Sequence, residues 1–165
     1  MSTLTAPTPA QVRAVIDTVP DPEMPPVSVG ELGMVVDVRV ERGGDGAHVA
    51  IDLVPTFSGC PATRVIREDV TSAVEAMDGV DSALVRFVAD VVWEPERISE
   101  PGRAKLREFG IAPPGSGQQL LSIGGVRCPL CGSRNTTAES PFGPTPCRST
   151  NHCRDCRNPF EAIKP

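Results

Sequence analysis

Four of the six cysteines in this 165-residue chain stand in two Cys-x-x-Cys pairs near its C-terminal end. The pairs are Cys128 with Cys131 and Cys153 with Cys156, and 21 residues separate them. Two such pairs can each form a tight knuckle whose thiolates point at one tetrahedral metal ion, as in structural zinc sites. Gly132 follows the first pair, where a tight turn favours glycine. The sequence therefore predicts a zinc ribbon held by these four cysteines.

Other uses of these thiols stay open from the sequence alone. Disulfides or a redox-active Cys-x-x-Cys site would use the same residues, and iron or an iron–sulfur cluster could replace zinc. We favour zinc because residues 126–165 have about the size, roughly 40 residues, below which folding usually needs a metal or another cross-link. Cys147 and His152 are spare donors, and either could replace one of the four ligands.

Cys60 is far from the other cysteines and lies in the sequence Gly59-Cys60-Pro61. Proline is favoured at the first position of a helix, so we expect a helix that begins at Pro61 with Cys60 at its positive end. Free amide groups there, together with Arg64 and Arg67, would lower the pKa of the thiol and supply a thiolate as nucleophile or metal ligand. The alternative is a buried cysteine that only fills space.

Two carboxylates, Asp21 and Glu23, lie in the proline-rich segment Asp21-Pro22-Glu23-Met24-Pro25-Pro26. Proline restricts the backbone of this loop, so the two side chains should have a fixed geometry. They could serve a reactive thiol or a metal, but a solvated loop that ends a helix would show the same pattern. The loop does not identify a metal site by itself.

The hydrophobic pattern predicts the elements that would position these residues. Helical spacing and strand-like alternation fall in separate stretches. Helices are expected over residues 10–19, 61–79 and 103–109, and strands over residues 34–40, 48–54 and 83–92. The glycine-rich segment 43–46 favours a hairpin between the first two strands. This order predicts a small α+β domain with one mixed or antiparallel sheet and its helices on one face.

We therefore expect four segments along the chain. These are a flexible arm (1–9), the α+β domain (10–111), a linker rich in proline, glycine and serine (112–125) and the zinc ribbon (126–165). The ribbon carries a net charge of +3 and the rest of the chain −8. Four thiolates and one zinc ion add −2, so we do not expect nucleic acid as a partner.

The sequence also gives an expectation for the cellular location of the protein. No apolar run reaches the roughly 20 residues that span a bilayer. The N-terminal residues lack the basic start and apolar stretch of a signal peptide. We expect a cytoplasmic protein with no membrane partner, in which clustered cysteines favour metal over disulfides.

Several stretches of the sequence resemble the MIP18 family, also called DUF59. They are Asp21-Pro22-Glu23, Leu32-Gly33-Met34-Val35 with Asp37, the segment 55–61 and the segment 102–111. With the ribbon, the segment 142–147 and Pro159-Phe160, the chain is similar end to end to the PaaD proteins of phenylacetyl-CoA epoxidase systems. The resemblance implies a small α+β domain, often dimeric, that works in iron–sulfur cluster assembly or metal-centre maturation. It also implies that Cys60 is the reactive cysteine, with Asp21, Glu23 and Thr56 as its pocket.

The leading hypothesis is a non-catalytic maturation factor. It would hold iron or an iron–sulfur unit transiently through Cys60 and dock on oxygenase or reductase subunits of a multicomponent di-iron system. One alternative is an adaptor subunit of that oxygenase with an inert Cys60, and another is an enzyme that uses Cys60 with Asp21 or Glu23. The sequence has no Ser-His-Asp set, phosphate loop or dinucleotide fingerprint, which disfavours the enzyme.

Overall fold

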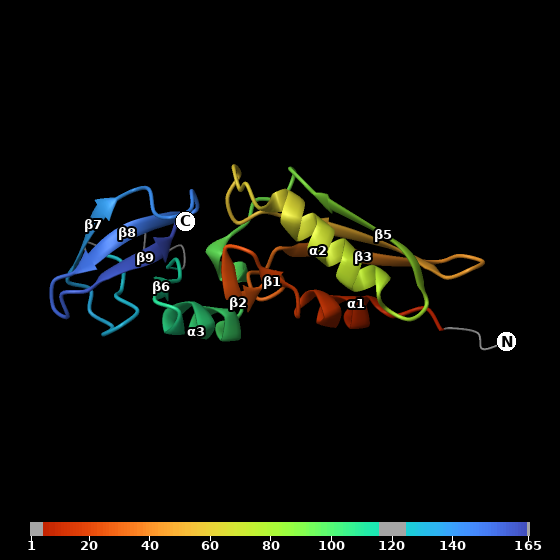
Figure 1. Cartoon of the computed structure of the whole chain (residues 1–165), viewed down its shortest axis with the longest axis horizontal. Helices are drawn as coiled ribbons and strands as arrows, with labels where there is room; N and C mark the ends of the chain where they lie inside the picture. The colour runs from red at the N-terminus through yellow and green to blue at the C-terminus, as the bar shows by residue number, and fades with distance from the viewer. Residues whose placement is uncertain (1–4, 116–124, 165) are drawn as a thin grey trace. The chain divides into compact units, whose positions relative to one another are not determined.

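The computed structural model of the chain describes residues 5–115 and 125–164 (Figure 1). Contacts between residues divide the chain into two compact units. The first consists of Met1–Pro55 and Pro61–Trp93, and the second of Thr56–Cys60 and Glu94–Pro165. Part of the predicted arm (residues 1–4) and most of the predicted linker (residues 116–124) lie outside the described residues.

The first unit is built on one mixed sheet. Its elements are, in order, α1 (Pro9–Ile16), β1 (Pro20–Asp21), β2 (Met24–Ser28), β3 (Val35–Arg42), β4 (Ala47–Leu53), α2 (Thr63–Glu75) and β5 (Val80–Phe87). β3 and β4 form the predicted antiparallel hairpin, and β5 runs parallel to β4, giving the strand order β3-β4-β5. A parallel pair needs a long crossover connection, and α2 supplies it. β1 and β2 form a separate small hairpin.

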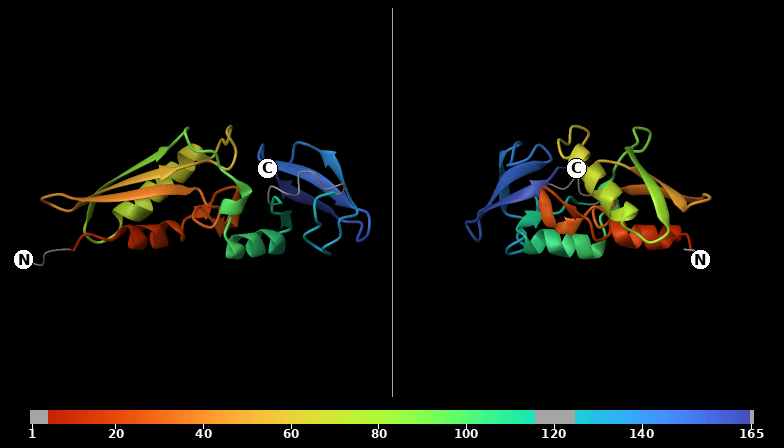
Figure 2. Two further views of the ribbon diagram at one scale, coloured as in Figure 1. Left: turned by 180° about the vertical axis from the view of Figure 1, so that it is seen from behind. Right: turned by 45° about the vertical axis from the view of Figure 1, so that its right-hand side comes forward.

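Both helices of this unit lie on one face of the sheet, as predicted (Figures 1 and 2). α1 begins at a capping box in which Thr8 and Gln11 bond each other's backbone amides. α2 buries Ile66, Val70 and Val74, which are spaced by four residues and so share one side of the helix. Each such fully buried aliphatic side chain contributes about 1.5–3 kcal/mol. The core between helices and sheet therefore carries most of this unit's stability.

The sequence placed some boundaries of the first unit incorrectly. The last strand was expected over 83–92, but β5 spans Val80–Phe87 because every residue of β4 has a pairing partner in that range. The hairpin β1–β2 was missed, since its prolines removed the usual strand signal. Trp93 is buried and donates a hydrogen bond from Nε1 to the carbonyl oxygen of Leu32 (2.8 Å).

The second unit contains the cysteine-rich segment. Its elements are, in order, the 3-10 helix η1 (Pro95–Arg97), α3 (Glu100–Glu108), β6 (Ile111–Ala112), β7 (Thr136–Ser140), β8 (Arg148–Cys153) and β9 (Pro159–Ile163). The sheet has the order β6-β9-β8-β7, with β6 parallel to β9 and the other pairs antiparallel. Ser99 caps α3 by accepting a hydrogen bond from the amide of Gly102 (3.1 Å).

One boundary between the units differs from the expectation. The sequence assigned the helix over 103–109 and Ile111 to the first domain and Ala112 to the linker. In the structure, Ile111 lies opposite Glu161 and Ala112 opposite Ala162, so β6 extends the ribbon sheet and carries α3 with it. β6 has only two residues and pairs with a strand some 50 residues later, so the local sequence carries no strand pattern that would predict it. Within the described parts of the chain, none of the helices has the length and apolar character needed to cross a bilayer.

Candidate functional site

The structure brings Cys128, Cys131, Cys153 and Cys156 together in the second unit. Their Sγ atoms all lie within 4.8 Å of one another. The Sγ atoms of Cys128 and Cys156 are 3.8 Å apart, and those of Cys131 and Cys153 are 3.6 Å apart. Four sulfurs at about 2.3 Å from a tetrahedral zinc ion are about 3.8 Å from each other. The cluster therefore fits zinc in a closed, four-thiolate site.

The backbone of each Cys-x-x-Cys pair forms a tight knuckle. In the first, the amide of Gly132 donates to the carbonyl oxygen of Cys128 (2.9 Å), and the amide of Cys128 donates to Ser133 (2.8 Å). In the second, the amide of Cys153 donates to the carbonyl oxygen of Asn158 (3.0 Å). Gly132 has a φ of 76°, and Arg157 at the equivalent place of the second knuckle has a φ of 61°. In both knuckles, the residue after the second cysteine thus has a left-handed backbone conformation, although only the first knuckle has glycine there.

The surroundings of the cluster shift the pKa values of Cys131 and Cys156 in opposite directions. The backbone amide of Asn158 stabilises the thiolate of Cys156 and lowers its pKa to about 7. At Cys131 the backbone amide of Ser133 acts the same way, but desolvation and the neighbouring thiols outweigh it and raise the pKa to about 12. Several thiolates cannot share this small volume unless a cation compensates their charge. Zinc would supply that charge, and its binding would release protons.

The cysteine cluster also contributes to the ribbon's small core. Cys128 and Cys153 are buried and pack with Ala112, Phe160 and Ala162. Because Ala112 belongs to β6, this core includes the strand that follows α3. Few apolar side chains contribute, so a bound metal would supply much of the stability of this core. We assign the site a structural role.

The carboxylate of Asp155 links the two knuckles. This role was not predicted from the sequence. Asp155, between the second pair of cysteines, accepts a hydrogen bond from Asn135 Nδ2 (2.7 Å) and another from the hydroxyl of Ser133. The bonds from Ser133 and Asn135 hold the pKa of Asp155 below its usual value. An acidic residue inside a Cys-x-x-Cys pair was the only local signal of this role.

The two spare donors do not join the cluster. Cys147 is buried, and its Sγ lies 3.2 Å from the hydroxyl of Thr145. His152 Nδ1 lies 3.9 Å from a carboxylate oxygen of Glu139. Among the described residues, the cysteine group that can hold a metal is therefore the predicted set of four.

Cys60 lies in a turn rather than at the first position of a helix. It is half-buried, and its amide donates to the carbonyl oxygen of Phe57 (3.0 Å). α2 begins at Thr63, with Ala62 as an N-cap that makes no side-chain capping bond. Cys60 is thus three residues before the helix, which corrects the expectation of a helix from Pro61. Arg64 also directs its guanidinium to Glu68 on the next turn (2.7 Å).

The predicted pocket residues belong to different units. Asp21 is buried in the first unit, and its Oδ1 accepts hydrogen bonds from the amides of Glu23 (2.8 Å) and Met24 (3.0 Å). Its carboxylate therefore closes the turn between β1 and β2. Thr56 is half-buried and belongs to the short segment that is grouped with the second unit, as does Cys60. A joint pocket of these four residues stays a prediction.

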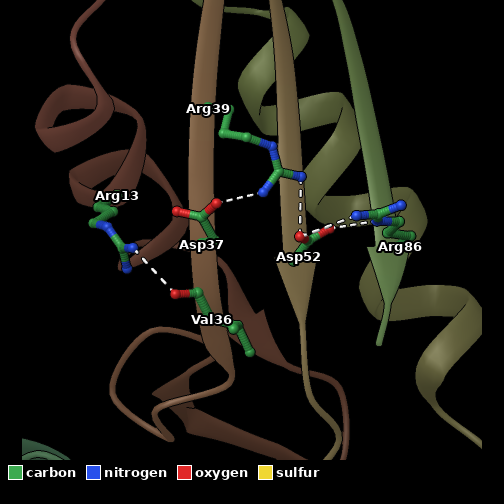
Figure 3. Close-up of polar contacts among 6 residues, drawn as sticks. All are labelled: Arg13, Val36, Asp37, Arg39, Asp52 and Arg86. Atoms are coloured by element: carbon green, nitrogen blue, oxygen red, sulfur yellow. Dashed lines mark hydrogen bonds and ion pairs between the residues drawn. The ribbon is translucent and has the colours of Figure 1, made fainter. Parts of the chain in front are cut away.

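An ion-pair network crosses the sheet of the first unit (Figure 3). Asp52 on β4 is buried and accepts hydrogen bonds from Arg39 Nη2 on β3 (2.9 Å) and Arg86 Nη2 on β5 (3.2 Å). Arg39 also pairs with Asp37. The hydrogen bonds from Arg86 and Arg39 outweigh the cost of burial and hold the pKa of Asp52 below its usual value. The network fastens all three strands together.

Comparison with known proteins finds a family match for each of two parts of the chain. Residues 9–85 match a family described as iron-sulfur cluster assembly protein, and residues 112–164 match the PaaD zinc beta ribbon domain. Fold and cysteine cluster thus define a protein with an iron–sulfur cluster assembly domain followed by a zinc ribbon. The chain is 36% identical to an Escherichia coli K12 protein over 169 residues, covering 99% of this chain and 97% of that one. That protein is provisionally named as a subunit of 1,2-phenylacetyl-CoA epoxidase, and the chain belongs to its family, the PaaD family.

Two further relatives match little more than half of this chain. The Fe-S protein maturation auxiliary factor YitW of Bacillus subtilis is 27% identical over 95 residues, covering 58% of this chain and 89% of that protein. An iron-sulfur cluster carrier protein of Synechocystis is 34% identical over 95 residues, but only 25% of that protein is covered.

Solved structures confirm the expected fold. A DUF59 domain from Bacillus anthracis superimposes with a TM-score of 0.52 at 28% identity, covering 59% of this chain and 90% of that domain. A conserved hypothetical protein from Thermotoga maritima also gives a TM-score of 0.52 at 28% identity, covering 67% of this chain and 99% of that one. The α+β class and the DUF59 resemblance predicted from the sequence are therefore correct.

Proposed function

We propose that this protein is a cytoplasmic maturation factor for the iron or iron–sulfur centre of a multicomponent oxygenase of the phenylacetyl-CoA epoxidase type. The observation that carries the proposal is the pairing of its two parts. Residues 9–85 match an iron-sulfur cluster assembly family, and relatives named for cluster carriage and maturation cover 58% of the chain. The whole chain resembles a protein named for the epoxidase. A factor that serves the metal centre of that oxygenase accounts for both resemblances.

Cys60 is the residue that we assign to the metal cargo. It is half-buried in a turn outside the helices, so its exposure can change without unfolding a helix. A maturation factor needs a site that its cargo can leave, and a single thiolate ligand suits such transient binding. Asp21 has an oxygen committed to two backbone amides, so we assign it the role of shaping the loop that presents Glu23. Thr56 would contribute its hydroxyl near Cys60 as a hydrogen-bond partner.

The zinc site has a separate role in this proposal. Its four thiolates form a closed set, and two of the four cysteines are buried in the ribbon core. Closed tetrahedral sites stabilise a fold and leave no open position for chemistry. The ribbon would therefore serve as a docking module for an oxygenase or reductase subunit, and iron would be handled elsewhere.

The experiment replaces Cys60 with Ala in cells that depend on the oxygenase. The oxygenase should accumulate to normal levels but contain depleted iron, because the delivery thiol is missing, and growth on the oxygenase substrate should be poor. Ser58→Ala changes an exposed neighbour on the same turn and should leave iron content and growth unchanged. Iron in the purified oxygenase is measured by elemental analysis.

A second candidate is supported by the name of the full-length relative, which calls that protein a subunit. Under this adaptor hypothesis the chain would be needed in every turnover. Purified, iron-replete oxygenase should work without this protein if the maturation proposal is correct. If the loaded oxygenase still needs one copy of this chain per complex, the adaptor hypothesis replaces the maturation proposal.

A further inference from the structure

The turn that carries Cys60 is contacted by a lysine that directly follows the last ribbon strand. Lys164 Nζ lies 5.7 Å from the ring centroid of Phe57 and 5.0 Å from that of Phe142. The same ammonium group donates a hydrogen bond to the carbonyl oxygen of Pro146 (2.8 Å). Both rings are within the distance at which a cation is attracted to an aromatic face. The segment Thr56–Cys60 is accordingly grouped with the ribbon.

Phe57 in turn determines the shape of the turn. Its carbonyl oxygen accepts the hydrogen bond from the amide of Cys60 (3.0 Å), which closes the turn. Its ring lies against Gly59, where an added Cβ would come within 3.3 Å of Cε1. A force that holds the Phe57 ring therefore also holds the backbone that presents Cys60.

Lys164 is tied to the zinc site through the ribbon sheet. It follows β9, and its amide donates to the carbonyl oxygen of Cys147 (2.9 Å). β9 pairs with β8, and β8 ends at the zinc ligand Cys153. Loss of the metal would loosen both strands and with them the position of the lysine.

We propose that Lys164 is a positioning residue for the Cys60 turn, through which the metal-bound ribbon limits access to the Cys60 thiol. The proposal rests on the proposed function only in taking Cys60 as the working thiol. The cation–π contact between Lys164 and Phe57 favours the held turn by roughly two- to fivefold, and the contact with Phe142 holds Lys164 in place on the ribbon. Docking of a partner on the ribbon could release the turn, so that the thiol would become available where the cargo is needed.

The test measures how fast Cys60 reacts with a limiting alkylating agent, followed by peptide mapping. Lys164→Met keeps the aliphatic stem but removes the cation, so the Cys60 rate should rise by roughly two- to fivefold while zinc content stays at one per chain. Lys164→Arg keeps the cation–π contacts and should react like the wild type. Lys105→Met removes a lysine from α3 and controls for the change in net charge. Chelating zinc from the wild type should raise the rate as Lys164→Met does.

Wild-type alkylation rates in zinc-loaded Lys164→Met would overturn the proposal, as would a fast Lys164→Arg variant. Phe142→Leu removes the second ring and provides an independent variant, expected to react faster than the wild type. The alkylation rate of Cys60 is measured independently of iron delivery, so the two proposals can fail separately. If Cys60→Ala cells load the oxygenase normally while Lys164→Met still exposes Cys60, the proposed function fails and the positioning role stands.

Discussion

Arg157 has the backbone conformation that glycine adopts at the matching place of the other zinc knuckle. Its φ of 61° brings Cβ close to the following carbonyl oxygen, which costs an L-residue roughly 1–2 kcal/mol. Gly132, at a φ of 76°, has no Cβ and avoids this cost. The hydrogen bond between Cys153 and Asn158 holds the second knuckle in this shape despite the strain, and zinc bound to the four cysteines would add to it.

Replacing Arg157 with Gly should therefore stabilise the ribbon. We expect a gain of about 0.5–1 kcal/mol in the free energy of unfolding, since relief of strain exceeds the added entropy of the unfolded chain. In a competition with a chelator, the variant should retain zinc about two- to fivefold better. Arg154→Gly, in the same knuckle but without positive φ, should weaken retention. Easier loss of zinc from Arg157→Gly than from the wild type would contradict this account.

Elements were predictable from the sequence where their signal is local. The grouping of the four cysteines followed from spacing, because a Cys-x-x-Cys knuckle is set by a few consecutive residues. The hairpin β3–β4 and helix α2 followed from periodicity. Pairings between distant segments left no such trace: β6 joins β9 from another part of the chain, and Asp52 meets Arg86 from 34 residues away. The role of Cys60 stays a prediction that local position and resemblance both supported, and local rules misplaced the helix start beside it.

The three-strand network gives the sheet a pH dependence with a definite sign. Hydrogen bonds from Arg86 and then Arg39 favour the ionised form of Asp52, so its pKa in the folded state lies below the usual 3.8. A carboxylate with a depressed pKa contributes stability that is fully present above its unfolded-state pKa. This contribution is lost as pH falls through the lower, folded-state pKa.

Asp52→Asn should lower the stability of the first unit by about 1–3 kcal/mol at pH 7, since it removes hydrogen bonds to charged groups. The difference from the wild type should begin to shrink as pH falls below about 4, where the unfolded chain binds the proton, and should vanish once the folded carboxylate is protonated too. Denaturant unfolding followed by the fluorescence of Trp93, the single tryptophan, reports on this unit. Asp37→Asn, at a half-exposed partner of Arg39, should cost less than about 1 kcal/mol. A stability difference for Asp52→Asn that persists unchanged at low pH would show that the charge of Asp52 does not matter.

At the scale of the whole molecule, the two units should respond differently to loss of the metal. The first unit has its own core between two helices and a sheet, while the second relies on a small core built around four cysteines. Structural zinc in such modules contributes about 10–16 kcal/mol of apparent binding free energy, which is more than the remaining apolar contacts can replace. Removing one ligand should therefore unfold the second unit and leave the first intact.

Cys131→Ser tests this division, because Cys131 is the exposed ligand and its replacement creates no cavity. The variant should lose stoichiometric zinc, while the Trp93 unfolding midpoint stays at the wild-type value. Amide hydrogen exchange should rise across β7, β8 and β9, and also in β6 and α3, because β6 is held by its pairing with β9. Cys147→Ser, at a buried cysteine outside the cluster, should keep its zinc. Full zinc in Cys131→Ser would mean that another donor completes the site. If the amides of α3 stayed protected from exchange after zinc loss, α3 would fold with the first unit rather than with the ribbon.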